Sequence, residues 1–268
     1  MDSPSSLVDC QRSTDWVSWL NSTYEICDRA TRFKIAQIRS SSTKLRSAIT
    51  ASGTLSAIPS KRPIFMLTSI ALITTVYNRA PFLAQTLDSI LAQTYPHFEL
   101  LIWDDGSTDG SVDIAQHYAR LDPRVRLIAF PSNQGLSVSL KSAIAATSGQ
   151  YLGWVDSDDL LAPTALEATV AVLEEFTDVG LVYTNYNLID EQGRDCGLGK
   201  LCRTPYSKEQ LLVDFMTFHF RLIRRSVYDR VGGVDDSLAS AEDYDLCLKL
   251  SEVTEIYHLA GGALDMGI

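Results

Sequence analysis

The sequence of 268 residues contains only five cysteines, and no two of them have the C-x-x-C spacing. An odd number of scattered cysteines without a paired spacing is not typical of a zinc site or of a disulfide framework. We therefore expect free thiols in a reducing compartment. The five residues are Cys10, Cys27, Cys196, Cys202 and Cys247.

The chain also lacks an apolar run long enough to cross a bilayer. The longest run, Ile64 to Val76, is interrupted by threonine and serine, whereas a spanning helix needs about 20 consecutive apolar residues. The first residues do not show the basic start and apolar core of a secretory signal. We therefore expect a cytoplasmic protein without a transmembrane segment. Peripheral association with the inner face of the membrane, through a lipid-linked acceptor or a partner, stays open.

Positive charge is scarce, because 23 Lys and Arg residues stand against 33 Asp and Glu residues, for a net charge of -10. Proteins that bind nucleic acid usually present a basic face, so a nucleic-acid partner is not expected. An anionic substrate remains compatible with this balance, because a divalent cation held by carboxylates reverses the local field and accepts a diphosphate. The length is sufficient for one large domain or two small ones.

The first 68 residues differ from the rest and form a predicted N-terminal extension. Ser and Thr are frequent, and Trp16, Trp19 and Cys27 fall at helical spacing, which predicts one amphipathic helix. Residues 39–43 and 51–63 have the composition of a linker. One hypothesis for this basic, tryptophan-bearing segment is an interaction module for which the remaining domain, residues 69–268, is the scaffold.

From residue 69 onward, apolar strands alternate with amphipathic helices. Continuous apolar strands in such an alternation predict an α/β fold with a mostly parallel sheet covered by helices on both faces. Ligands of such sheets bind beyond the carboxyl ends of the strands. The predicted strands are 70–73, 98–103, 125–130, 151–155, 179–183 and 253–258, and the predicted helices are 80–93, 111–121, 135–147, 162–176, 208–215, 226–231 and 242–251, with an apolar segment at 218–223.

Three carboxylates within four residues follow the fourth predicted strand, in the run Asp156-Ser157-Asp158-Asp159. Such carboxylates repel one another unless a cation lies among them, and their hard oxygen ligands suit Mg²⁺ or Mn²⁺. Such a cation could bridge a diphosphate and neutralise a leaving group. The alternative is a helix cap, in which Asp158 or Asp159 caps the helix that starts near Pro163.

Three other polar clusters follow strands or begin a helix, and each also has a purely structural interpretation. Asp104-Asp105-Gly106-Ser107-Thr108-Asp109-Gly110 could be a turn with an N-cap. A calcium loop is excluded there, because its twelfth position is Gln116 and a strand precedes it. Tyr77 could stack on a base or pack at the rim. Glu242-Asp243 could serve only as a negatively charged first turn of a helix.

Together, these clusters resemble the inverting glycosyltransferase family 2, which has the GT-A fold, over roughly residues 69–258. The agreement in order and spacing makes the resemblance specific, although each motif alone is weak. The motifs are Thr75-Val76-Tyr77-Asn78, Asp104-Asp105-Gly106-Ser107-Thr108-Asp109, Asn133-Gln134-Gly135-Leu136-Ser137, Asp156-Ser157-Asp158-Asp159, Arg224-Arg225 with Val231-Gly232-Gly233-Val234-Asp235, and Glu242-Asp243-Tyr244-Asp245-Leu246.

The resemblance implies a metal-dependent, inverting transfer of a sugar from a nucleoside-diphosphate sugar, with a UDP- or GDP-sugar expected, to a hydroxyl of a glycan, polysaccharide or lipid-linked acceptor. Asp243 matches the general base of this reaction, and Asp156 and Asp158 match the Asp-x-Asp motif that contacts the sugar nucleotide and Mg²⁺ or Mn²⁺. The expected contacts to the donor are Thr75, Tyr77, Asn78, Asp105, Gly135, Lys141, Asp156 and Ser157.

Two parts of the sequence depart from the family pattern. Leu140-Lys141 stands where many members have Arg-Asn, which keeps a cation nearby but affects the expected donor preference. Members also usually continue beyond the last predicted strand into an aromatic-rich segment that closes over the acceptor, and the residues 260–268 do not match it. We expect acceptor contacts from elsewhere or a truncated form. A truncated, catalytically silent nucleotide-sugar-binding protein is therefore the alternative hypothesis.

Overall fold

The computed structural model describes residues 69–190, 193–238 and 240–267. The helix expected around Trp16 to Cys27 and the expected linkers lie outside these residues. The boundary after residue 68 therefore stays a prediction. Within the described part, no helix combines the length and the hydropathy that a membrane span requires.

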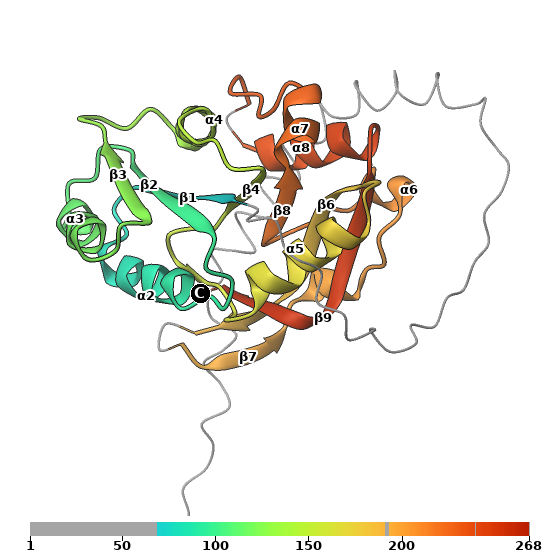
Figure 1. The fold of residues 1–268 in the computed structure, drawn as a ribbon, viewed down its shortest axis with the longest axis horizontal. Coiled ribbons are helices and arrows are strands. Elements are labelled where there is room, and N and C mark those ends of the chain that lie inside the picture. Colours follow the sequence, from blue (N-terminus) through green and yellow to red (C-terminus); the bar gives the residue numbers. More distant parts are fainter. Residues whose placement is uncertain (1–68, 191–192, 239, 268) are drawn as a thin grey trace, which may run out of the picture. The chain divides into compact units, whose positions relative to one another are not determined.

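The first half of the described chain is a regular alternation of strands and helices, as predicted (Figure 1). The strands begin where the predicted apolar runs begin, because most of these side chains are buried in the sheet, but the first and the last of these strands continue past their predicted ends at residues 73 and 183. The elements are β1 (Ile70–Val76), α2 (Ala80–Leu91), β2 (Phe98–Asp104), α3 (Ser111–Leu121), β3 (Val125–Ala129), α4 (Leu136–Ala145), β4 (Tyr151–Trp154), β5 (Asp159–Leu160), α5 (Ala165–Glu175) and β6 (Val179–Ile189).

The second half contains shorter and less regular elements. The helix predicted over 208–215 is only a single turn, and the apolar segment at 218–223 contains a strand. The last strand continues well past its predicted end at residue 258. The elements are β7 (Asp195–Leu198), the 3-10 helix η1 (Lys200–Arg203), α6 (Lys208–Leu211), β8 (Arg221–Arg224), α7 (Arg225–Arg230), α8 (Glu242–Ser251) and β9 (Glu255–Gly267).

One sheet joins the strands of the described part, in the order β3-β2-β1-β4-β8-β6-β9-β5, with β7 paired to β6. The strands from β3 to β4 are parallel to one another, as are β6 and β9. The strand β8 runs antiparallel between β4 and β6 and joins the two parallel parts. The carboxyl ends of β1, β2 and β4 therefore lie side by side at one edge, where ligands are expected.

Two hydrophobic cores lie on opposite faces of the sheet, because successive side chains of a strand point to opposite sides. Ile70 and Leu72 of β1 belong to the core that includes residues of α2 and α5. Ala71 and Ile73 belong to the core that includes residues of α4, α7 and α8. Figure 1 shows the corresponding arrangement, with α2, α3 and α5 on one side of the strands and α4, α7 and α8 on the other.

The loop after β2 lies against the loop after β3 at Gly106. Gly106 has a φ of +80°, and a Cβ atom built on it would lie 2.5 Å from the backbone carbon of Ser132. Only glycine allows both the left-handed conformation and such a close backbone approach. This contact determines where the loops after β2 and β3 stand relative to each other.

We expect Gly106→Ala to lower the free energy of unfolding by about 2–4 kcal/mol, because backbone strain and a steric clash add together. Gly232→Ala is a matched control. Gly232 has a φ of +81°, but nothing lies within 4 Å of the position that a Cβ atom would take there, so only the conformational cost of about 1 kcal/mol applies. Urea unfolding of both variants measures the difference. Equal losses of stability would show that the approach to Ser132 is unimportant.

Candidate active site

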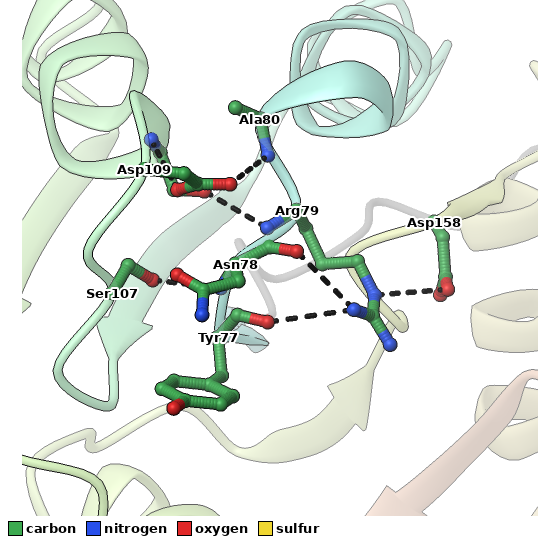
Figure 2. A network of polar contacts seen from close by, with 8 residues as sticks. Tyr77, Asn78, Arg79, Ala80, Ser107, Asp109 and Asp158 are labelled. Atoms are coloured by element: carbon green, nitrogen blue, oxygen red, sulfur yellow. Dashed lines mark hydrogen bonds and ion pairs between the residues drawn. The ribbon is translucent and has the colours of Figure 1, made fainter.

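The polar clusters after β1 and β2 are joined by hydrogen bonds of the Asp109 carboxylate (Figure 2). Its Oδ2 accepts from the backbone N–H of Ala80 (3.0 Å), at the start of α2, and its Oδ1 accepts from the backbone N–H of Ser111 (2.9 Å), at the start of α3. The Oδ1 of Asn78 accepts from the backbone N–H of Thr108 (2.8 Å). The turn interpretation of this cluster is therefore correct for Asp109, which holds both strand-end loops in a fixed arrangement.

Asp105 and Gly135, both predicted to contact the nucleotide, are brought together. The buried Asp105 carboxylate accepts hydrogen bonds from the backbone N–H groups of Gln134 (2.9 Å) and Gly135 (3.0 Å). A carboxylate oxygen has two lone pairs, so both oxygens keep a free acceptor direction. Gly135 has a φ of +95°, a backbone conformation that glycine adopts without steric cost.

Three other predicted donor contacts lie at the carboxyl end of β1 or directly after it. Thr75 is the penultimate residue of β1 and is half-buried, and Asn78 follows with the loop contacts described above. The Tyr77 side chain is 45% exposed, and Figure 2 shows its ring pointing away from the polar network. An exposed aromatic ring at the end of β1 is available for stacking on a base, which stays a prediction.

A small pocket that opens to solvent lies beyond the end of β4. Asp156 and Asp243, which are 87 positions apart in the sequence, both line it. The other lining residues are aromatic, aliphatic or charged: Trp154, Val155, Asp159, Leu160, Leu161, Phe218, His219, Phe220 and Arg221. Aromatic walls combined with convergent carboxylates are the chemistry of a ligand pocket.

The surroundings of the Asp156 carboxyl group disfavour its ionised form. Its side chain is exposed at the pocket surface, and its pKa is raised to about 6. The protein around the pocket displaces bulk water, which raises this pKa most, and the nearby Asp158 and Asp243 carboxylates also raise it, whereas Arg221 and Arg79 oppose the increase. Asp156 makes no side-chain hydrogen bond with a described residue. Such a carboxyl group gains from a cation ligand.

Neither Asp158 nor Asp159 caps the following helix. The N-cap of α5 is Thr164, and no side chain caps this end. Instead, the Oδ2 of Asp158 lies 3.1 Å from the Nε of Arg79, and the Oδ2 of Asp159 lies 3.2 Å from the Nδ1 of His219. The helix-cap interpretation of this cluster is therefore not supported. Ser157, which precedes Asp158 in the sequence, is buried.

Asp243 lies in the first turn of α8, where its carboxylate faces the cavity. Ala241 before the helix has a φ of +69°, and the Oδ1 of Asp243 accepts from the backbone N–H of Tyr244 (2.8 Å). Its Oδ2 accepts a hydrogen bond from the Nη2 of Arg221 (3.1 Å). The carboxylate is thus oriented by two donors while 23% of the side chain stays exposed. A held, partly open carboxylate can accept a proton from a ligand.

Arg221 is a site residue that sequence reasoning missed. Its side chain is only 6% exposed, and its guanidinium lies over the rings of Trp154 (5.3 Å) and Phe215 (5.4 Å). Burial lowers the pKa of Arg221, but the Asp243 carboxylate and other partners raise it above its ordinary value, so the guanidinium stays charged. The sequence does contain one indication of this role. Arg221 lies in the largely apolar segment 218–223, and a buried arginine is rare unless it is paired.

Lys141 does not line the cavity in this structure. Its ammonium lies 2.7 Å from the Oδ1 of Asp236, and both side chains are exposed. The pKa of Lys141 is raised mainly by this hydrogen bond. Its predicted role beside the nucleotide would require this exposed pair to open, and stays a prediction.

The described residues fit a divalent cation in charge and in ligand chemistry, but they do not form a complete coordination shell. No group of three or more His, Cys, Asp or Glu side chains in the described residues has the arrangement of a metal site. Asp156 and Asp158 offer hard oxygen ligands, and a cation usually completes such a pair with water and substrate phosphate.

Comparison with known proteins identifies the chain. Residues 71–232 match the family described as "Glycosyl transferase family 2". The chain belongs to glycosyltransferase family 2. It is 33% identical over 191 residues to a chondroitin synthase of Escherichia coli, an alignment that spans 71% of this chain and 27% of the relative. The chain thus spans about a quarter of the length of that family member.

Solved structures of glycosyltransferases confirm the predicted GT-A fold. The structure of residues 1–349 of S. aureus TarS with UDP-GlcNAc has a TM-score of 0.61 at 20% identity, and the match covers 75% of this chain and 59% of that fragment. The mannosyltransferase PcManGT from Pyrobaculum calidifontis, with GDP-Man and Mn²⁺, has a TM-score of 0.57 at 20% identity, over 74% of this chain and 56% of that protein. The resemblance to family 2, predicted from the motifs, and the α/β architecture, predicted from the alternation of strands and helices, are therefore correct.

Proposed function

We propose that this chain transfers a sugar from a nucleoside-diphosphate sugar to an acceptor hydroxyl, with inversion and with the help of a divalent cation. The observation that supports this most directly is the common cavity of Asp156 and Asp243. The Asp156 carboxylate, proposed to bind the donor, and the partly exposed Asp243 carboxylate, which is oriented by Arg221, face the same space. Membership of family 2 makes nucleotide-sugar chemistry the natural use of this space.

Asp243 has the properties of a general base for this reaction. Its carboxylate would take the proton of an acceptor hydroxyl while that oxygen attacks the anomeric carbon. Arg221 donates to Oδ2, so the remaining acceptor directions of the carboxylate are held toward the cavity. Because the attack and the departure of the diphosphate occur on opposite sides, a single displacement inverts the anomeric centre, by the logic that applies to inverting hydrolases.

Asp156 and Asp158 would hold Mg²⁺ or Mn²⁺ together with the diphosphate of the donor. The bound cation would supply Lewis-acid stabilisation of the leaving diphosphate. The raised pKa of Asp156 supports this assignment, because the surrounding protein and two neighbouring carboxylates disfavour its ionisation in the absence of a cation.

The nucleoside would lie along the edge made by Thr75, Tyr77 and Asp105. Asp105 would accept a hydrogen bond from the base, and Tyr77 would stack on it. The nucleotides of the similar structures, UDP-GlcNAc in TarS and GDP-Man in PcManGT, support a UDP- or GDP-sugar as the donor. The chondroitin synthase relative supports a polysaccharide or glycan acceptor.

A thermal-shift screen of UDP- and GDP-sugars with and without Mn²⁺ tests the proposed function. A ligand that binds only the folded state stabilises it by RT ln(1 + [L]/Kd), so the correct donor is expected to raise Tm only when the metal is present. Hydrolysis or transfer of that sugar would then support an active enzyme. Metal-dependent binding without turnover would support the alternative of a catalytically silent nucleotide-sugar-binding protein, and no binding would contradict both.

The effect of pH on metal binding follows from the raised pKa of Asp156, which is about 6 against an ordinary value of 3.8. The folded state holds this proton more tightly than the unfolded chain does. Without metal, the stabilising effect of this group is therefore complete below the ordinary pKa and is lost as the pH rises through about 6. Since a cation needs the ionised carboxylate, the stabilisation by Mn²⁺ should be larger at about pH 7.5 than at about pH 5.

Melting temperatures with and without Mn²⁺ at both pH values measure this effect. The matched variant Asp156→Asn has no carboxyl group to titrate at this position, so its response to Mn²⁺ should be small at both values. An equal response of the unsubstituted protein at both pH values would contradict a role for Asp156 in cation binding.

A further inference from the structure

Arg79 connects the loop after β1 with the carboxylate cluster after β4 (Figure 2). Its Nε donates to the Oδ2 of Asp158 (3.1 Å). Its Nη1 donates to the backbone carbonyl groups of Asn78 (3.2 Å) and Tyr77 (3.5 Å). The guanidinium thus lies between the proposed nucleoside edge and the proposed metal ligands, which is where a diphosphate would lie.

The backbone at Arg79 is held firmly, whereas its side chain is not. The backbone N–H donates to the Oγ of Ser111 (2.9 Å), which fixes the base of the side chain at the start of α2. The side chain is 45% exposed, and that of Asp158 is 29% exposed. Ion pairs with this degree of exposure are weak, because water solvates both partners when the pair opens. The guanidinium can therefore leave Asp158 without a large cost.

Arg79 and a divalent cation compete for the same carboxylate oxygen. The Oδ2 of Asp158 accepts from Arg79 in this structure, and a guanidinium and a divalent cation that contact the same oxygen repel each other, so each weakens the binding of the other. At the same time, the Nη2 of Arg79 makes no hydrogen bond with a described residue, and Figure 2 shows it directed away from the network. A planar guanidinium with unused donors is well suited to phosphate oxygens.

We propose that Arg79 is a displaceable counter-cation of Asp158, which moves to the diphosphate oxygens of the donor when a divalent cation binds Asp158. This inference rests on the proposed function for the identity of the diphosphate. Before the ligand binds, Arg79 reduces the repulsion within the carboxylate cluster. After the metal binds, Arg79 neutralises negative charge that the metal alone leaves on the diphosphate.

The proposal predicts changes of opposite sign for Arg79→Met. Removing the competing cation should tighten the binding of Mn²⁺ alone by about 2- to 5-fold, which is the range of an exposed ion pair. Removing the phosphate ligand should weaken UDP or GDP binding in saturating Mn²⁺ by about 10- to 100-fold, which is typical of a hydrogen bond to a charged group. Electron paramagnetic resonance of free Mn²⁺ measures the first affinity, and isothermal titration measures the second.

Arg126→Met is the matched control. Arg126 lies on β3, has a similar exposure of 49% and pairs with Glu99 at 3.4 Å, outside the strand-end clusters. The substitution removes the same charge, so both affinities should stay close to those of the unsubstituted protein. Arg79→Lys, which keeps the charge but not the planar donors, should leave Mn²⁺ binding nearly unchanged and weaken nucleotide binding. Thermal unfolding checks that each variant is folded.

A fall of both affinities in folded Arg79→Met would overturn the proposal, because it would indicate a purely structural role. Tighter Mn²⁺ binding with unchanged nucleotide binding would also overturn it, since Arg79 would then not reach the diphosphate. If the unsubstituted protein binds neither UDP nor GDP with Mn²⁺, the proposed function itself fails. The Mn²⁺ titration is carried out without nucleotide. It therefore distinguishes a failure of the Arg79 proposal from a failure of the proposed function.

Discussion

Replacing Asp243 with Asn is expected to reduce sugar transfer by about 10²- to 10⁴-fold while donor binding stays nearly unchanged. The substitution removes the proposed base and changes little volume. The amide oxygen that it introduces can still accept one hydrogen bond from Arg221 or Tyr244, so the start of α8 should be preserved. A loss confined to turnover is what the removal of a group that acts only in the transition state produces.

Asp245→Asn is the control for this substitution. Asp245 lies in the same helix and pairs with Lys249 at 2.6 Å, away from the cavity lining. The control makes the same change of charge and shape two residues later. Turnover and donor affinity are measured with the donor that the thermal-shift screen selects. Turnover should fall in Asp243→Asn and not in Asp245→Asn, and transfer by Asp243→Asn at the unsubstituted rate would refute the assignment of the base.

Replacing Asp156 with Asn is expected to weaken metal-dependent nucleotide binding by about 100-fold or more, since even groups that only support a metal ligand typically contribute about 10- to 100-fold. The same substitution should raise Tm in the absence of metal at neutral pH. The reason is that the ionised carboxylate of Asp156 is disfavoured by its surroundings and by the Asp158 and Asp243 carboxylates. A metal-binding side chain that destabilises the metal-free protein but is required in the metal-bound protein is typical of a functional site.

Asp113→Asn provides the comparison, because Asp113 is exposed in the first turn of α3 and the substitution makes the same change of charge. It should affect neither nucleotide binding nor the response to Mn²⁺. Isothermal titration of UDP and GDP with and without Mn²⁺ measures the first effect, and thermal unfolding without metal measures the second. Unchanged affinity of Asp156→Asn in the presence of Mn²⁺ would place the metal site elsewhere.

Most of the parallel part of the sheet was predictable because its strands are buried on both faces. Ile70 to Ile73 are all fully buried, so a continuous apolar run marks the strand without ambiguity. The helices α2 and α3 begin and end close to their predicted bounds for a related reason, since one face of each helix is apolar. The positions of Asp105 and Asp156 followed from the rule that ligands bind at strand ends.

The second half was less predictable, since its elements are short or depend on distant partners. The strand β8 has four residues and is stabilised by pairing with β4 and β6 on either side. The two-residue strand β5 forms only because it pairs with β9. Neither arrangement leaves a periodic pattern in the sequence, so propensity alone does not distinguish such segments from loops.

The ion pairs of the site were also beyond sequence reasoning. Arg79 and Asp158 are 79 positions apart, and Arg221 and Asp243 are 22 positions apart. Each pair depends on how separate elements meet at the edge of the sheet, which the motifs do not encode. The ion pair of Lys141 was also not predictable. The motifs predict a nucleotide contact for this residue, whereas its partner in the structure is Asp236.

A crystal structure of the protein with Mn²⁺ and the nucleoside diphosphate selected by the screen tests the central claim most directly. The anomalous signal of manganese locates the cation independently of the protein coordinates. We predict one strong peak at the carboxylates of Asp156 and Asp158, with the diphosphate bound to it and Asp243 facing the space that the sugar would fill. A nucleotide bound without manganese at these carboxylates, or manganese bound at a different site, would contradict the account.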